Sequence, residues 1–185
     1  MVKKLTKYFF DEERTVYDLI KLCFLVFVFS GFFGFIYEEI FYRIDLGYFV
    51  KRGTTFGPWI PIYGFGSIFI SLLAYKYKKN PVVVFLLAAI VSGIVEYGTA
   101  WFCWDILGIR LWDYNVEIWN WGNINGFICY RSVGFFAVSG LLLMYAVIPI
   151  SKKIVEKSHD SKALSFIIYA LGILFALDII VSLIV

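Results

Sequence analysis

The stretch KLCFLVFVFSGFFGFIYEEIFY at residues 21–42 decides the fold. It is almost wholly apolar, and it is long enough to cross a hydrocarbon core, which requires about 20 residues of α-helix. Four later runs have the same character, at about 59–76, 81–104, 127–150 and 163–185. The pattern predicts an all-α fold, a polytopic transmembrane helix bundle of about five spans.

Composition supports this assignment. Of the 185 residues, 61% are apolar and 21% are aromatic, and the mean hydropathy is +0.81. Soluble domains contain about 45–50% apolar residues, so the composition indicates an integral membrane protein. Residues 1–20 mix charged and aromatic residues and are expected to form an N-terminal interfacial segment, followed by a single transmembrane helical domain at 21–185. No GxxxxGK[ST] loop occurs, so an ATP-driven role would require a separate protein.

Basic residues predict the orientation. With a cytoplasmic N-terminus, twelve of the 17 lysines and arginines fall in inner segments and five in outer segments. The positive-inside rule therefore favours this topology for a multi-pass protein of the cell membrane. The inner loops would be 75–81 and 151–162, and the outer loops 43–58 and 105–126. His159, the single histidine, lies in an expected inner loop and is predicted to be solvated.

Charged residues also fall inside the predicted spans. Glu38 and Glu96 would lie about 21–24 Å from the inner boundary of a core about 30 Å thick, and Asp178 at a similar level. Arg131 would enter the fourth span from outside. A charge at a helix centre raises the insertion free energy by about 2.5–3.5 kcal/mol, so such residues usually face a partner or a polar cavity.

Two interpretations of this charged layer remain open. In the first, Arg131 neutralises one acid and the layer is an ion-paired scaffold. In the second, the groups line a polar cavity that opens outward. Three acids against one arginine exceed what a scaffold requires, and each glutamate shares a helix face with small residues that allow close helix approach. The cavity interpretation predicts these substrate-binding residues: Glu38, Glu96 and Arg131, with Arg52, Tyr63, Asp113 and Tyr114 at the mouth.

The outer loops are rich in Gly, Pro, Asn, Trp and both signs of charge. Arg52 and Arg110 either hold a phosphate or carboxylate through paired hydrogen bonds or pair with neighbouring surface acids. The tryptophans near the outer boundary indicate an aromatic belt, with a sugar-stacking platform as the alternative. Cys103 and Cys129 form either a disulfide or two free thiols. Neither the cysteines nor the lone histidine has the spacing of a metal site, so no metal or cofactor is expected.

Several short motifs are distinctive: Gly34-x-x-x-Glu38, Arg52-Gly53, Gly57-Pro58-x-x-Pro61-Ile62-Tyr63-Gly64-x-Gly66, Glu96-Tyr97, Trp112-Asp113-Tyr114-Asn115 and Asn123-x-Asn125-Gly126-x-Ile128-Cys129. Together they resemble a bacterial family of small membrane proteins, the putative ABC-transporter permeases (type IV). The resemblance extends over about 30–150, which leaves the helix with Asp178 outside it. The chain departs from the family pattern at Phe35, where the family favours Trp, at Lys51, where it often has Asn, and at Phe127, where it usually has Arg.

The leading hypothesis is a membrane transport component with an outward-facing polar site for a small polar or amphipathic substrate. A separate ATPase subunit is implied by the resemblance alone. The alternatives are a membrane enzyme that acts on a lipid or lipid-linked substrate, and a structural or regulatory subunit of a membrane complex. Expected partners are membrane lipids and either a second copy or another subunit of a complex, with no nucleic acid. No familiar catalytic constellation occurs, and catalytic residues stay unassigned.

Overall fold

The computed structural model describes residues 2–12, 14–53 and 55–184. Within these ranges the chain is 75% helical and contains no strand. The predicted all-α fold is therefore confirmed. The elements in chain order are α1 (Val2–Phe10), α2 (Val16–Leu46), α3 (Pro61–Ala74), η1 (Tyr75–Tyr77), α4 (Pro81–Trp101), η2 (Phe102–Ile106), α5 (Tyr130–Leu142), η3 (Leu143–Val147), α6 (Ile148–Asp160) and α7 (Lys162–Ile184).

The described residues contain four helical segments that are long and apolar enough to span a membrane: Val16–Leu46, Pro81–Ile106, Tyr130–Asp160 and Lys162–Ser182. The expected span at 59–76 corresponds to α3, which has 14 residues. At about 1.5 Å per residue it is about 21 Å long, shorter than the hydrocarbon core. The cytoplasmic location of the N-terminus stays a prediction of the charge distribution.

The prediction of an inner loop at 151–162 is largely wrong, because residues 148–160 form the helix α6. The helical run from α5 reaches α6 through the π-helical turn η3. Pro149 directly follows η3, and because proline has no N–H to donate to the preceding turn, the regular α-helical pattern is interrupted at this point. The basic segment therefore continues the fourth span as a helix.

Local chemistry accounts for the helix ends. Thr15 and Asp18 form a capping box at the start of α2, and Gly47 ends that helix in the left-handed conformation. Asn80 accepts hydrogen bonds from the first free N–H groups of α4, and Pro81 occupies the first turn. α3 begins at Pro61.

The chain forms two compact units. Unit 1 comprises residues 1–68 and 145–185, and unit 2 comprises residues 69–144, all of which are described. The division into an N-terminal interfacial segment and a single transmembrane domain is still a prediction, because these two compact units do not test it.

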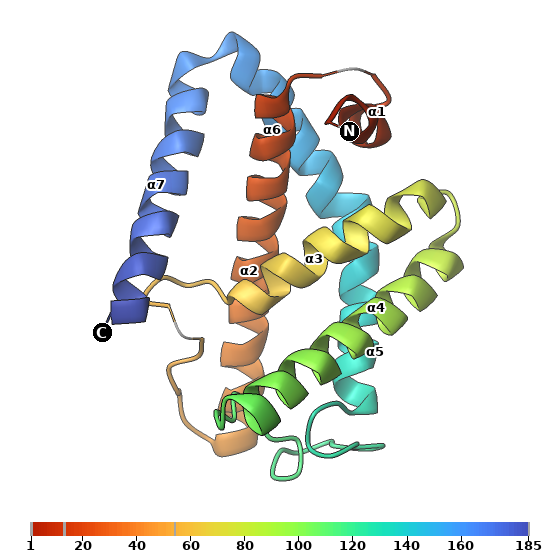
Figure 1. Ribbon diagram of the computed structural model, residues 1–185, viewed down its shortest axis with the longest axis vertical. Helices are drawn as coiled ribbons and strands as arrows, with labels where there is room; N and C mark the ends of the chain where they lie inside the picture. The colour runs from red at the N-terminus through yellow and green to blue at the C-terminus, as the bar shows by residue number, and fades with distance from the viewer. Residues whose placement is uncertain (1, 13, 54, 185) are drawn as a thin grey trace. The chain divides into compact units, whose positions relative to one another are not determined.

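In unit 1, α2 packs against α6, and α6 packs against α7 (Figure 1). The buried Lys21 of α2 donates hydrogen bonds to the hydroxyls of Ser158 (3.0 Å) and Ser165 (3.3 Å). Nearby on α2, the buried carboxylate of Asp18 lies 2.9 Å from Nε2 of His159. The side chain of His159 is exposed, and its imidazole also lies beside this acid.

In unit 2, α4 crosses α5, and small residues let the two backbones approach (Figure 1). Ala88 and Ala137 are fully buried. A Cβ atom at Gly140 would lie 2.3 Å from the Cβ of Ala88, so only glycine fits at this crossing. The same face of α4 carries the buried Glu96, as predicted from its spacing to small residues.

Candidate functional site

The first charged cluster lies in unit 1 and surrounds Glu38 of α2. Nε of Arg52 donates to one carboxylate oxygen at 2.9 Å, and the hydroxyl of Tyr63 donates to the other at 3.0 Å. The guanidinium of Arg52 also lies 3.6 Å from the ring centroid of Tyr42. Both oxygens of Glu38 are thus engaged, one by a charged donor and one by a neutral donor.

Gly34 makes this arrangement sterically feasible. It precedes Glu38 by one helical turn, and a Cβ atom there would lie 2.2 Å from the ring of Tyr63. The aromatic ring therefore needs a glycine on the facing helix before its hydroxyl can reach the carboxylate. Gly34 therefore provides the space in which Tyr63 can donate its hydrogen bond to Glu38.

Glu96 is the centre of the second cluster, in unit 2. Its side chain is buried, and its Oε1 accepts a hydrogen bond from the hydroxyl of Tyr114. Within the residues that the structure describes, Oε2 is buried and accepts no hydrogen bond. Burial raises the pKa of Tyr114 well above its usual range, and the negative charge of Glu96 raises it further. Tyr114 therefore remains a protonated donor.

Arg131, at the start of α5, completes the second cluster. Its Nη2 lies 2.5 Å from Oε2 of Glu117, and both side chains are almost fully buried. Its guanidinium lies 5.3 Å from the ring centroid of Tyr114. The scaffold interpretation expected this arginine to neutralise an acid within a span, whereas it pairs with a loop acid. Glu117 lies within the expected outer loop at 105–126, yet its side chain is buried.

A network of polar side chains stabilises the loop that positions Tyr114 beside Glu96. Oδ1 of Asp113 accepts from Nη2 of Arg110 (2.8 Å), and from the backbone N–H (2.9 Å) and side-chain amide (2.8 Å) of Asn115. The N–H of Tyr114 donates to the carbonyl of Gly126 at 3.0 Å. Asp113 and Arg110 therefore satisfy each other, and the expected mouth residue Asp113 fixes the turn beside Tyr114.

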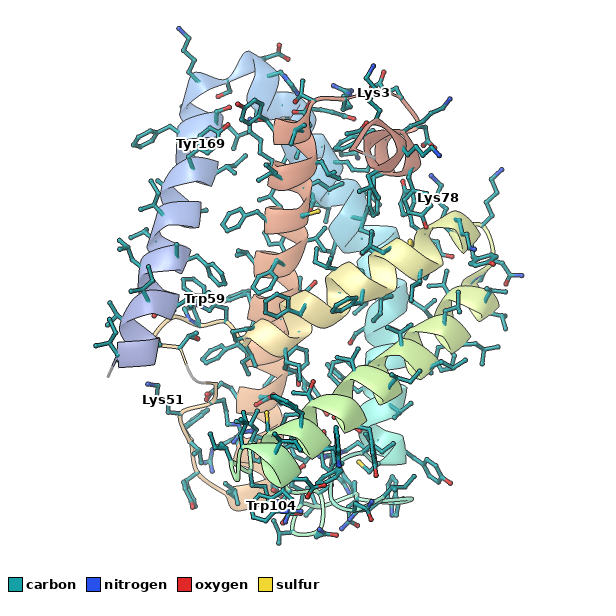
Figure 2. The ribbon with its side chains drawn as sticks, viewed as in Figure 1. Lys3, Lys51, Trp59, Lys78, Trp104 and Tyr169 are labelled. Atoms are coloured by element: carbon teal, nitrogen blue, oxygen red, sulfur yellow. The ribbon has the colours of Figure 1, made fainter. Side chains whose placement is uncertain are left out.

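Asp178 of α7 binds the loop before α3. Its carboxylate accepts from the backbone N–H groups of Phe56 (2.9 Å) and Gly57 (3.1 Å) and from the indole N–H of Trp59 (2.7 Å). Figure 2 shows Trp59 beside α7. The predicted charged layer did not include these neutral partners, because backbone donors leave no signature in a sequence.

The remaining open alternatives concern cysteines and tryptophans. In the described part of the chain all three cysteines are free thiols, and no group of residues could hold a metal ion. The indole N–H of Trp112 donates to the carbonyl of Phe127 at 2.9 Å, which gives this tryptophan a structural partner. Trp121 is exposed, as an aromatic belt requires.

These features define a multi-pass helical membrane protein that holds buried carboxylates in its spans. Comparison with known families identifies it further. The chain belongs to the family described as Putative ABC-transporter type IV, whose sequence model matches residues 25–183. No curated protein and no solved structure matches the chain. The match includes Asp178, so the expectation that this residue lies outside the family region is wrong. Family membership and the four apolar spans make this a transport-related membrane protein.

Proposed function

We propose that the chain is the membrane component of an ABC-type transporter with an outward-facing polar site for a small polar or amphipathic substrate. One observation carries this proposal: each in-span glutamate is bonded directly by a residue that was expected at the mouth. Arg52 and Tyr63 bind Glu38, and Tyr114 binds Glu96. Within each unit, a residue expected at the mouth thus donates to the glutamate: both oxygens of Glu38 and Oε1 of Glu96 accept such a hydrogen bond.

The two ion pairs differ in how readily they open. Arg52 and Glu38 are 21% and 16% exposed, whereas Arg131 and Glu117 are 12% and 5% exposed, so water reaches the first pair more readily and screens its attraction more strongly. Removing one partner of a buried pair such as Arg131 and Glu117 costs about 3–5 kcal/mol. A substrate that offers a hydrogen-bond donor or a cation can therefore replace Arg52, while Arg131 and Glu117 serve as a fixed support.

The arginine partners also bear on the lipid-enzyme alternative. Arg52, Arg110 and Arg131 each have a carboxylate partner, in Glu38, Asp113 and Glu117 respectively. A phosphate group would have to displace an acid from each of them. This arrangement favours transport over an enzyme that binds a lipid phosphate through these arginines.

The test begins with the protein in its native membranes. It is purified in mild detergent, copurifying proteins are identified by mass spectrometry, and ATP hydrolysis is measured with a panel of small polar and amphipathic compounds. We expect an ATP-hydrolysing subunit, supplied by a separate chain, and stimulation by at least one compound. Glu38→Gln and Glu96→Gln should abolish the stimulation.

The matched control is Glu39→Gln, which changes the neighbouring glutamate of α2 and leaves both clusters intact. This variant should retain stimulation. Copurification of a complex without any ATP-hydrolysing subunit would overturn the transport function and favour a structural or regulatory role. Full stimulation of both the Glu38 and Glu96 variants would show that the site is elsewhere.

A further inference from the structure

The Glu96 cluster of unit 2 holds more acid than base. Glu96, Glu117 and Arg131 are the charged groups around it, and all are buried or nearly so. Arg131 is paired with Glu117, and the hydrogen bond to Oε1 of Glu96 comes from the neutral hydroxyl of Tyr114. With both acids ionised, the cluster would carry one uncompensated negative charge in a buried site, which is strongly unfavourable.

The hydrogen bonds of Glu96 indicate where a compensating positive charge belongs. An ionised carboxylate has two acceptor oxygens and no donor. Oε1 has its donor in Tyr114, whereas Oε2 is buried and accepts no hydrogen bond from any described residue. The unmet requirement is thus located at one atom, inside a helix that spans the membrane.

Ser132 offers the partner that a proton on Oε2 would need. Its side chain is buried and lies within interaction range of the Glu96 carboxyl. Its own hydroxyl proton is donated to the carbonyl of Cys129 at 2.9 Å, and its oxygen accepts the N–H of the same residue at 3.2 Å. A hydroxyl oxygen has two acceptor lone pairs, so one remains for an O–H group of Glu96.

We propose that Glu96 is a proton-binding site. One proton from solvent attaches to Oε2, which then donates to Ser132, while Oε1 continues to accept from Tyr114. The cluster becomes neutral as a whole, and every buried polar atom of Glu96 is satisfied. Release of the proton returns the negative charge, which strengthens the hydrogen bond from Tyr114 and attracts Arg131. Proton occupancy therefore sets how firmly the loop that carries Tyr114 is held on α4.

This inference goes beyond transport, because it rests on unit 2 alone and requires neither a substrate nor an ATPase. Glu38 provides an internal comparison. It has the same side chain on another span, but it faces Arg52, and both of its oxygens accept hydrogen bonds. The structure assigns an exchangeable proton to Glu96 and none to Glu38.

The test is infrared difference spectroscopy of the full-length protein in lipid nanodiscs, recorded across a pH titration in H₂O and D₂O. We expect a C=O stretching band of a protonated carboxyl that shifts in D₂O and disappears as the pH rises. The band should be lost in Glu96→Gln and retained in the control Glu38→Gln. A band that persists in Glu96→Gln, or the absence of any such band at low and neutral pH, would overturn the proposal.

A second variant allows the proposal to be tested even if Glu96→Gln does not fold. Tyr114→Phe removes the donor to Oε1 and keeps the carboxyl in place. The same band should then move to higher frequency, because its carbonyl oxygen has lost a hydrogen bond. An unchanged band frequency in the folded Tyr114→Phe protein would assign the band to another acid and refute the site. Failure here leaves the transport experiment unaffected, since that experiment measures stimulated ATP hydrolysis.

Discussion

Gly126 offers the sharpest test of the loop that positions Tyr114. Its φ angle is +75°, and a methyl group there would lie 2.4 Å from Nη2 of Arg110, 2.5 Å from Nδ2 of Asn115 and 2.6 Å from Oδ1 of Asp113. Real Cβ atoms essentially never approach so closely. Gly126→Ala must therefore move the polar network in addition to straining the backbone.

The two contributions can be separated, because Gly108 has a similar φ of +69° and, among the described residues, no atom within 4 Å of a Cβ placed there. Gly108→Ala should show the backbone strain alone, about 1–2 kcal/mol. Gly126→Ala should also disturb a partly exposed ion pair, worth up to about 1 kcal/mol. Two hydrogen bonds to Asp113 add about 0.5–1.5 kcal/mol each. We expect Gly126→Ala to be less stable than Gly108→Ala by about 2 kcal/mol.

The assay is denaturant unfolding of the two variants and the parent protein in the same detergent. The midpoint for Gly126→Ala should fall clearly below that for Gly108→Ala. Because the N–H of Tyr114 donates to the carbonyl of Gly126, fluorescence or infrared probes of Tyr114 should change in the Gly126 variant alone. Equal stability of the two alanine variants would refute the reasoning, since it would mean that the polar network around Gly126 can rearrange without lowering the free energy of unfolding.

Three further predictions concern the other contacts. Asp178→Asn keeps the shape of the side chain but halves its acceptors, so the loop at Trp59 should become more susceptible to limited proteolysis than in the parent protein; equal cleavage would contradict this. Glu117→Gln leaves Arg131 without its buried carboxylate and should lower the free energy of unfolding by about 3 kcal/mol, while changing both residues to apolar ones should restore much of the loss; a double variant as unstable as the single one would argue against the pair. The raised pKa of Tyr114 means that the folded state retains a proton that the unfolded chain releases above about pH 10, so stability should fall as the pH rises past that value, and Tyr114→Phe should reduce this slope in unfolding measurements.

The long apolar helices were predictable, because a bilayer requires continuous apolar runs and the sequence displays them directly. The basic segment at 151–162 was predicted as a loop on account of its charge. It carries a periodic signal, since Ile148, Ser151, Val155 and Ser158 recur at helical spacing and are the buried residues of α6. A helix that extends beyond the membrane can thus be recognised by its periodicity where hydropathy fails.

The sequence was sufficient to predict the acidic residues of the candidate site, but it predicted only some of the residues that pair with them. Glu38 and Glu96 were conspicuous because charge is rare within an apolar span. Their partners depend on loops whose course is set by unusual backbone conformations, including φ of +55° at Trp119 and +57° at Asn125. No sequence rule places a tryptophan in that region of φ, so the burial of Glu117 and its pairing with Arg131 required the folded loop.

The contact between Lys21 and Ser158 has a consequence for how the protein is made. The two residues are 137 positions apart, so the lysine leaves the ribosome long before its acceptor. At about 5–20 residues per second, the delay is on the order of ten seconds. During that time the N-terminal end of the first span must keep its ammonium group hydrated. Unit 2, by contrast, is one continuous segment that can pack before residues from 145 onward complete unit 1. The order of synthesis therefore makes unit 1 the late-maturing part of the molecule.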